Sequence, residues 1–233
     1  MTLQLLHERL LAWATDGARK EELLAARRFH FDRYGEPHEE DRTYEPRLNG
    51  MLDYYLYDHR PAGGTGTTIE RFIEAEGPSL SPEELAAYQD LARNVHGLFE
   101  VRKIRDGLLR LRDVFTAGDY DVTERRHVAG LDKGDVLEAR LLPFQGALYF
   151  SGAFLYHPRE AHKAIHAEVK RLRKAAGKGG TVDVKEFLAT LSRMAFKLER
   201  YRNVRLESIY DFAAESRLPT PRPARPPGEP SAQ

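Results

Sequence analysis

Hydrophobic residues in the first 97 positions recur mainly every three or four residues, the spacing of one face of an α-helix. Leu3, Leu6, Leu10 and Trp13 show this pattern clearly. The spacing predicts helices over residues 2–14, 18–33 and 47–58. The chain therefore begins as a helical region.

Two further helix starts are marked by capping boxes, in which a hydroxyl side chain precedes a glutamate by three positions. These are Thr67 with Glu70 and Ser81 with Glu84. Gly77 and Gly97 lie where the two helices are expected to end, because glycine commonly follows the last helical turn. The helical region should thus extend to about residue 97.

The pattern then changes to short segments separated by turn sequences. Leu137, Ala139 and Leu141 alternate with Glu138 and Arg140, which is typical of a half-buried strand. Five short antiparallel strands are best closed into a small barrel, because open edges favour aggregation. We predict these strands over residues 98–104, 108–115, 119–127, 135–142 and 147–156.

Helical spacing returns after residue 157 with a stripe that resembles a heptad repeat. We consider this stripe a candidate surface for binding another protein, because amphipathic helices often dock in this way. The alternative is that it only closes the protein's own core. The five candidate residues are Phe187, Leu191, Met194, Leu198 and Tyr201.

These patterns predict an α+β protein with N-terminal helices, a small five-stranded antiparallel domain and a C-terminal helical hairpin. The last segment is rich in proline and poor in apolar residues, so we expect it to be disordered. The expected divisions are 1–45, 46–97 as the helical part of the core, 98–157 as the β domain, 158–217 and the tail 218–233.

Residues 48–157 carry a series of motifs that resembles a family of poorly characterised bacterial proteins related to SEC-C-motif proteins. The resemblance lies in residues 54–58, 68–72, 81–84, 99–101, 111–115 and 131–143. It implies a small β domain packed on helices. Some members carry a C-terminal zinc-binding motif that contains cysteine. This chain has no cysteine, so no zinc role transfers to it and no activity is implied.

Composition narrows the class of function. Lysine plus arginine equals aspartate plus glutamate at 36 each, so the overall charge favours neither nucleic acid nor an anionic membrane. The absence of cysteine excludes disulfides and thiolate nucleophiles. No signal-peptide pattern or bilayer-length apolar segment is present, so we expect a cytoplasmic protein with no membrane span.

Three groups of residues could carry chemistry. His162 and His166 would share one helical face and are weak candidates for a metal site, although solvated or packing histidines are more common. Residues 29–34 and 38–41 combine aromatic, histidine and carboxylate side chains, which could hold a metal or act in acid–base chemistry, although such a run more often indicates a hydrophilic loop after an aromatic anchor. A basic patch at a helix end could bind phosphate or could simply complement the helix dipole; it comprises Lys170, Arg171, Arg173, Lys174 and Lys178.

These observations favour a non-enzymatic adaptor or regulatory protein that binds another protein of unknown identity. A nucleic-acid-associated protein that uses the β domain and the basic patch is the alternative, and a metal-dependent enzyme is the third. No catalytic signature is recognisable, so we expect no catalytic residue and no cofactor. The oligomeric state is open.

Overall fold

The structure is a computed structural model that describes residues 1–61, 63–105, 107–124, 130–201 and 203–215. Its N-terminal region is helical, as the apolar spacing predicts. Both predicted capping boxes form, with the Thr67 and Ser81 side chains accepting from the amides of Glu70 and Glu84. The α-helices of this region are α1 (Leu3–Ala14), α2 (Lys20–Tyr34), α3 (Tyr44–Tyr57), α4 (Thr68–Glu76) and α5 (Pro82–Ala92), with short 3₁₀ turns at Gly17–Arg19 and Gly77–Ser79.

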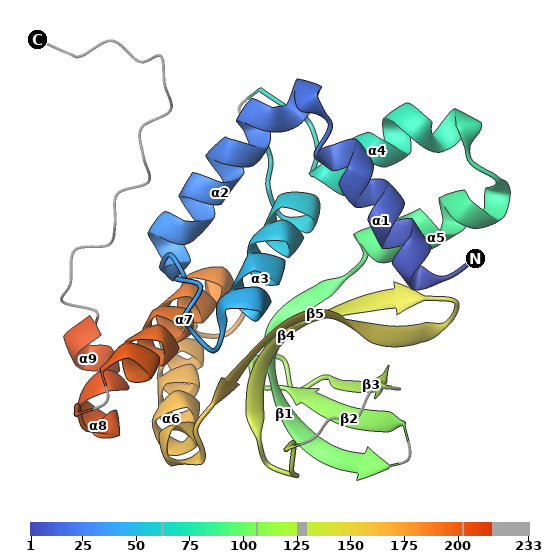
Figure 1. The fold of residues 1–233 in the computed structure, drawn as a ribbon. Helices are drawn as coiled ribbons and strands as arrows, with labels where there is room; N and C mark the ends of the chain where they lie inside the picture. The colour runs from blue at the N-terminus through green and yellow to red at the C-terminus, as the bar shows by residue number, and fades with distance from the viewer. Residues whose placement is uncertain (62, 106, 125–129, 202, 216–233) are drawn as a thin grey trace, which may run out of the picture.

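Five strands follow, as predicted, and form a closed barrel in the order β1-β2-β3-β5-β4 (Figure 1). The pairs are antiparallel except β3 with β5, which run parallel at Val122 and Leu148, so the expectation of a purely antiparallel sheet is corrected there. Gly97 lies within the first strand and ends no helix. The strands are β1 (Val95–Arg105), β2 (Leu108–Asp113), β3 (Asp119–Thr123), β4 (Val136–Phe144) and β5 (Ala147–His157).

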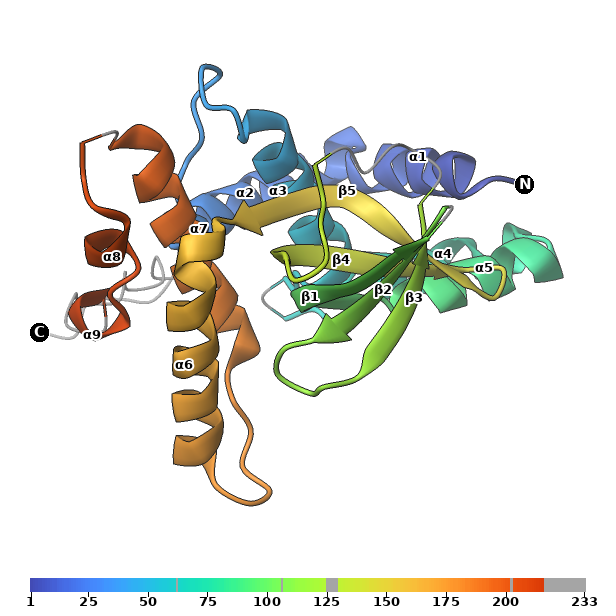
Figure 2. The same ribbon diagram turned by 90° about the horizontal axis from the view of Figure 1, so that it is seen from below.

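The C-terminal region is helical and forms the predicted α6–α7 hairpin beside the barrel (Figure 2). Asp183 caps α7 by accepting from the amide of Glu186 at 3.0 Å. The helices are α6 (Arg159–Ala176), α7 (Val184–Arg200), α8 (Leu206–Ile209) and α9 (Phe212–Glu215). The predicted disordered tail, 218–233, lies outside the described residues.

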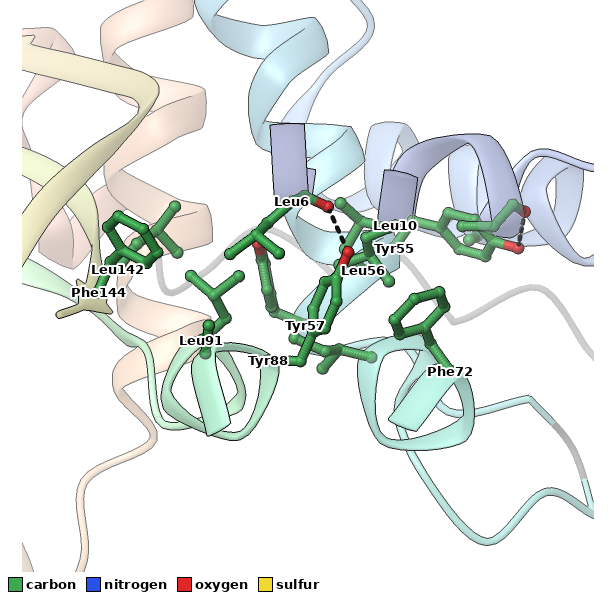
Figure 3. Packing of buried hydrophobic residues seen from close by; sticks show 14 residues of the cluster. Leu6, Leu10, Tyr55, Leu56, Tyr57, Phe72, Tyr88, Leu91, Leu142 and Phe144 are labelled. Atoms are coloured by element: carbon green, nitrogen blue, oxygen red, sulfur yellow. Dashed lines mark hydrogen bonds between the residues drawn. The ribbon is translucent and has the colours of Figure 1, made fainter. Parts of the chain in front are cut away.

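Three apolar clusters hold these elements together. The first, which we call the N-terminal cluster, joins α1, α3, α4 and α5 to the end of β4. In it Tyr88 donates to the carbonyl of Leu6 and Tyr55 donates to that of Ala14 (Figure 3). The second, which we call the C-terminal cluster, joins α6, α7 and α8 to Leu98. The third fills the barrel. Helices from both ends of the chain are thus anchored on the barrel.

The stripe on α7 belongs mostly to the second cluster. Phe187, Leu191 and Met194 are buried there and Leu198 is half-buried, whereas Tyr201 is 59% exposed. The first four side chains pack inside the protein, so in this fold the stripe closes the core instead of presenting a continuous surface to a partner. The heptad-like spacing arises because α6 and the barrel both cover this side of α7.

Candidate functional site

A cavity of about 80 Å³ lies where the barrel meets helices from both ends of the chain. Helices α2, α3 and α7 form one wall, and strands β1, β4 and β5 form the other. Aromatic rings and ionisable groups share the lining, and we call the site the helix–barrel pocket. Its central polar residues are His30, Asp53, Asp58, His96, Glu138 and Arg140.

Strand β4 explains why polar groups occupy this position. Side chains along a strand alternate between its two faces. On the outer face, Val136 packs in the C-terminal cluster, whereas Leu142 and Phe144 pack in the N-terminal cluster. Glu138 and Arg140 lie between them on the same face. The pocket is therefore a polar gap between two apolar cores.

A bulge in β5 opens the wall opposite Arg140. Ala139 pairs with Phe154 and Leu141 pairs with Phe150, so residues 151–153 face Arg140 alone. Gly152 has φ +100°, a conformation that residues with a Cβ rarely adopt. The bulge directs the Ser151 hydroxyl to Asp53, to which it donates a hydrogen bond. Bulges commonly redirect side chains in this way beside functional sites.

Arg140 is almost fully buried and is held by a charge network. Its guanidinium donates to the side chains of Asn94 and Asp58. The other carboxylate oxygen of Asp58 accepts from Lys185 Nζ at 2.7 Å. The Nε of Arg140 lies 3.7 Å from Asp53 Oδ2, which is within ion-pair range but too far for a hydrogen bond. The network links α3, β4 and α7.

The two aspartates of this network have opposite pKa shifts. Burial would raise the pKa of Asp58, but Arg140 and the hydrogen bond from Lys185 outweigh that effect and hold the pKa below its ordinary value. Burial raises the pKa of Asp53, and the nearby Arg140 only partly opposes this. Asp58 is thus the main partner of the buried cation, whereas ionised Asp53 is disfavoured.

His30 brings an uncharged imidazole to the pocket. Its ring stacks on that of Tyr34, with centroids 4.5 Å apart. Burial, reinforced by the charges of His96 and Arg47, lowers the pKa of His30 to about 3. At neutral pH His30 therefore carries no charge. Burial also lowers the pKa of the neighbouring Arg47, to about 10, and the Arg47 guanidinium donates to the hydroxyl and the carbonyl of Ser192 at 3.1 Å each.

Four residues that line this cavity each have a buried polar atom that lacks a hydrogen-bond partner among the described residues: His30 Nδ1, Arg33 Nε, Glu138 Oε2 and Arg140 Nε. The other oxygen of Glu138 lies 2.9 Å from His96 Nε2. Buried polar groups are nearly always paired with protein, water or ligand, since leaving one unpaired costs about 1–3 kcal/mol. The residues that line the pocket thus include unpaired donors, an unpaired acceptor and an unpaired imidazole nitrogen.

The two weak metal candidates, His162 and His166, each contact other protein groups in this fold. His162 Nε2 lies 2.9 Å from the carbonyl of His157, and His166 Nε2 lies 3.9 Å from a Glu100 carboxylate oxygen. Across the described ranges no group of three or more histidine, aspartate or glutamate side chains is arranged to hold a metal ion. These two histidines therefore have protein neighbours of their own.

The structure separates the other predicted groups. In the basic patch, Arg171 pairs with Glu168, whereas Lys170, Arg173, Lys174 and Lys178 line an open groove. Of the two mixed segments, 29–34 contributes His30 to the pocket. In segment 38–41, Asp41 instead pairs with Arg200 at 2.9 Å.

Sequence reasoning missed most of the pocket. Asp53 and Asp58 lie close together in the sequence but far from His96, and no pattern in the sequence marked these three residues as parts of one site. The available signal was the pair Glu138 and Arg140, two charges in an otherwise apolar stretch of β4. A strand with one apolar and one charged face is usually half exposed, and this one is covered by helices.

A family model described as a family of unknown function (DUF7986) matches residues 16–207. No curated protein and no solved structure matches the chain. A relation to SEC-C-motif proteins stays a prediction. Within the described part of the chain, no helix combines the length and apolar character needed to cross a membrane.

Proposed function

We propose that this chain, which belongs to the DUF7986 family of unknown function, is a non-enzymatic regulatory protein. It binds a small, uncharged polar molecule in the helix–barrel pocket. One observation carries the proposal: His30, Arg33, Glu138 and Arg140 all line one cavity, and each has a buried polar atom without a hydrogen-bond partner among the described residues. A bound molecule that carries donor and acceptor groups would offer partners to such atoms.

The charge balance supports an uncharged ligand. Arg140 is compensated by Asp58, which also pairs with Lys185. An added cation would lie beside Arg140 and Lys185, which share the one carboxylate of Asp58, and an unpaired charge in a buried site is strongly unfavourable. A molecule without charged groups avoids that cost. An amide-like group, which donates and accepts at once, matches Arg140 Nε and Glu138 Oε2.

The size and lining support a compact ligand. A cavity of about 80 Å³ exceeds the roughly 10–15 Å³ that one water needs by this measure. Phe31, Tyr34 and Tyr54 supply aromatic walls. Ligand sites typically combine such apolar walls with a few convergent polar groups.

Binding without catalysis is supported by the state of the titratable groups. A general base works best when its pKa lies near the operating pH. The pKa of His30, about 3, is far below neutral pH, and Asp58 is already bonded to two cations.

A regulatory role is supported by the position of the pocket. It touches α2, α3, the barrel and α7, so a ligand would contact elements from both ends of the chain.

The experiment compares small molecules released from three forms of the full chain. Each form is incubated with the small-molecule fraction of a cell extract, separated by gel filtration, denatured and analysed by mass spectrometry. In Glu138→Gln the unpaired oxygen becomes an amide nitrogen, so an acceptor is replaced by a donor at the same size. Glu100→Gln makes the same change on β1, outside the pocket.

The proposal predicts one neutral molecule released in near-stoichiometric amount from the unmodified protein and from Glu100→Gln. Glu138→Gln should release at least tenfold less. Release of nothing above background from any form would overturn the proposal, and so would equal release from Glu138→Gln.

A further inference from the structure

An open groove of about 930 Å³ runs along the C-terminal half of α6. Its other sides are the 177–182 segment, the start of α7 and residues 114–116, which follow β2. It is separate from the helix–barrel pocket, with which it shares no lining residue. We call it the basic groove.

Among the described residues, the charged side chains that line the basic groove all have one sign, although Asp183 lies in sequence between the lining residues Val182 and Val184 and Glu100 lies 3.9 Å from the lining residue His166. Lys170, Arg173, Lys174 and Lys178 line it, and none of its lining residues is an aspartate or a glutamate. None of these four cations forms an ion pair with any described residue. On the same helix, Arg171 lies outside the lining and is neutralised by Glu168. The chain as a whole has no net charge, so this excess of positive charge belongs to the groove and not to the protein in general.

The helix dipole accounts for only part of this arrangement. Arg173 and Lys174 lie in the last turn of α6, where cations are favoured. Lys178 lies beyond the helix end, and Lys170 lies before the last turn. The dipole also does not explain why no described lining residue is an aspartate or a glutamate.

The floor of the groove is apolar. Val114, Val182 and Val184 are partly buried and lie beside the buried Val169 and Phe115. Apolar groups of this kind favour side chains of a partner over water. A basic rim above an apolar floor is complementary to a segment that carries both acidic and apolar side chains.

The shape of the groove is fixed by its loop. Helix α6 ends before Gly177, which has φ +69°, and Gly179 has φ +84°. A Cβ at Gly180 would lie only 1.9 Å from the carbonyl oxygen of Ala176. The chain therefore returns closely over the helix end at a position that only glycine can occupy.

We infer that the basic groove docks an acidic amphipathic segment of a partner protein. The inference does not depend on ligand binding in the helix–barrel pocket. Nucleic acid fits less well, because the described lining offers no exposed Phe, Tyr or Trp ring on which bases could stack and the chain as a whole is uncharged. The chain's own tail, 218–233, has two arginines and one glutamate, so its charge is not complementary.

The test is a selection of displayed random 16-residue peptides on the immobilised full-length protein. Binding of the enriched peptides is then measured to the unmodified chain and to two variants by fluorescence anisotropy. Lys170→Glu with Lys174→Glu reverses two charges in the groove. Lys163→Glu with Arg171→Glu makes the same net change at exposed α6 positions outside the lining.

We expect enriched peptides with net negative charge and two or more apolar residues. Their affinity should fall at least tenfold in the groove variant and less than threefold in the control variant. Melting temperatures within a few degrees of the unmodified chain establish that both variants are folded. Failure to enrich peptides, enrichment of neutral or basic peptides, or equal loss in both variants would overturn the inference. It would also be overturned if a labelled 20-nucleotide single strand bound with the same charge dependence while peptides did not, or if light scattering showed that the groove joins two copies of the chain.

Discussion

The two faces of β4 are buried to a similar degree but differ in chemistry. The inner face, Leu137, Ala139 and Leu141, fills the barrel with side chains that are at most 1% exposed. On the outer face, Glu138 and Arg140 are 9% and 3% exposed and face the helices. Burial of the inner face contributes stability directly. Burial of the outer charges is costly unless every polar atom is paired.

Folding alone explains the chemistry of the inner face but not that of the outer face. An apolar outer face would join the N-terminal and C-terminal clusters without a gap, and replacing buried ion pairs by apolar residues is often neutral or stabilising. The protein instead keeps a charge network there, with unpaired polar atoms around a cavity. We therefore interpret the inner face as the structural core and the outer face as a binding site.

The largest expected effect comes from a charge on the inner face. Leu141→Asp would bury an unpaired carboxylate in the barrel and should cost more than about 4 kcal/mol, enough to unfold the protein. Urea unfolding followed by circular dichroism measures this. Leu108→Asp, at an exposed position of β2, is the control and should stay folded. A Leu141→Asp protein that melts within a degree or two of the unmodified chain would show that the barrel assignment is wrong.

Removal of Asp58, the main anionic partner of Arg140, should cause the second largest loss of stability. Asp58→Ala leaves Arg140 buried with only Asn94 and the more distant Asp53, and should cost about 3 kcal/mol. The same urea titration measures it. Asp119→Ala breaks the exposed pair with Arg112 and should leave the melting temperature unchanged. Equal effects of the two variants would mean that the outer-face network is no more important than a surface pair.

The pH dependence of stability tests whether His30 is buried and uncharged in the folded protein. Burial holds the pKa of His30 at about 3, so below pH 6.5 the unfolded chain binds a proton that the folded chain does not. The free energy of unfolding should therefore decrease as pH falls, by about 1 kcal/mol per pH unit from this group. His30→Gln should remove that part of the slope between pH 6 and 5. The buried His157, whose pKa is also lowered to about 3, keeps its own part. Parallel curves for His30→Gln and the unmodified chain would contradict the assignment.

The smallest expected effect is at Gly50, which lines the pocket from within α3. A Cβ there would meet only Ala153 Cβ, at 4.0 Å. Gly50→Ala should raise stability by about 0.5–1 kcal/mol, because glycine is unfavourable inside a helix. It should also narrow the pocket and reduce the released ligand in the mass-spectrometric experiment. Thermal unfolding and ligand release together would show whether this glycine serves binding; a gain in stability with unchanged release would argue against that role.

Local patterns predicted the fold well. The two capping boxes, the five strands and the C-terminal hairpin follow from side-chain spacing, which acts over a few residues. The parallel pairing of β3 with β5 depends on barrel closure, which is a long-range contact. Spacing also found the stripe on α7, but it could not tell whether α6 and the barrel would cover it.

The pocket was harder to predict for the same reason. Asp58 meets Arg140 across 82 positions of sequence, and His96 meets Glu138 across 42. A single sequence carries no signal for such pairs. The alternation in β4 separated its two faces correctly, but the cover over the charged face comes from α2, α3 and α7. An expectation of half-burial was therefore wrong for Glu138 and Arg140.

Electron density in the helix–barrel pocket tests the central claim most directly. Crystals of the unmodified full chain, loaded with the small-molecule fraction and diffracting well enough to resolve single waters, would show what the unpaired atoms bind. We expect a non-water molecule within hydrogen-bonding distance of Glu138 Oε2 and Arg140 Nε. A pocket filled only by ordered waters bridging His30, Glu138 and Arg140 would contradict it.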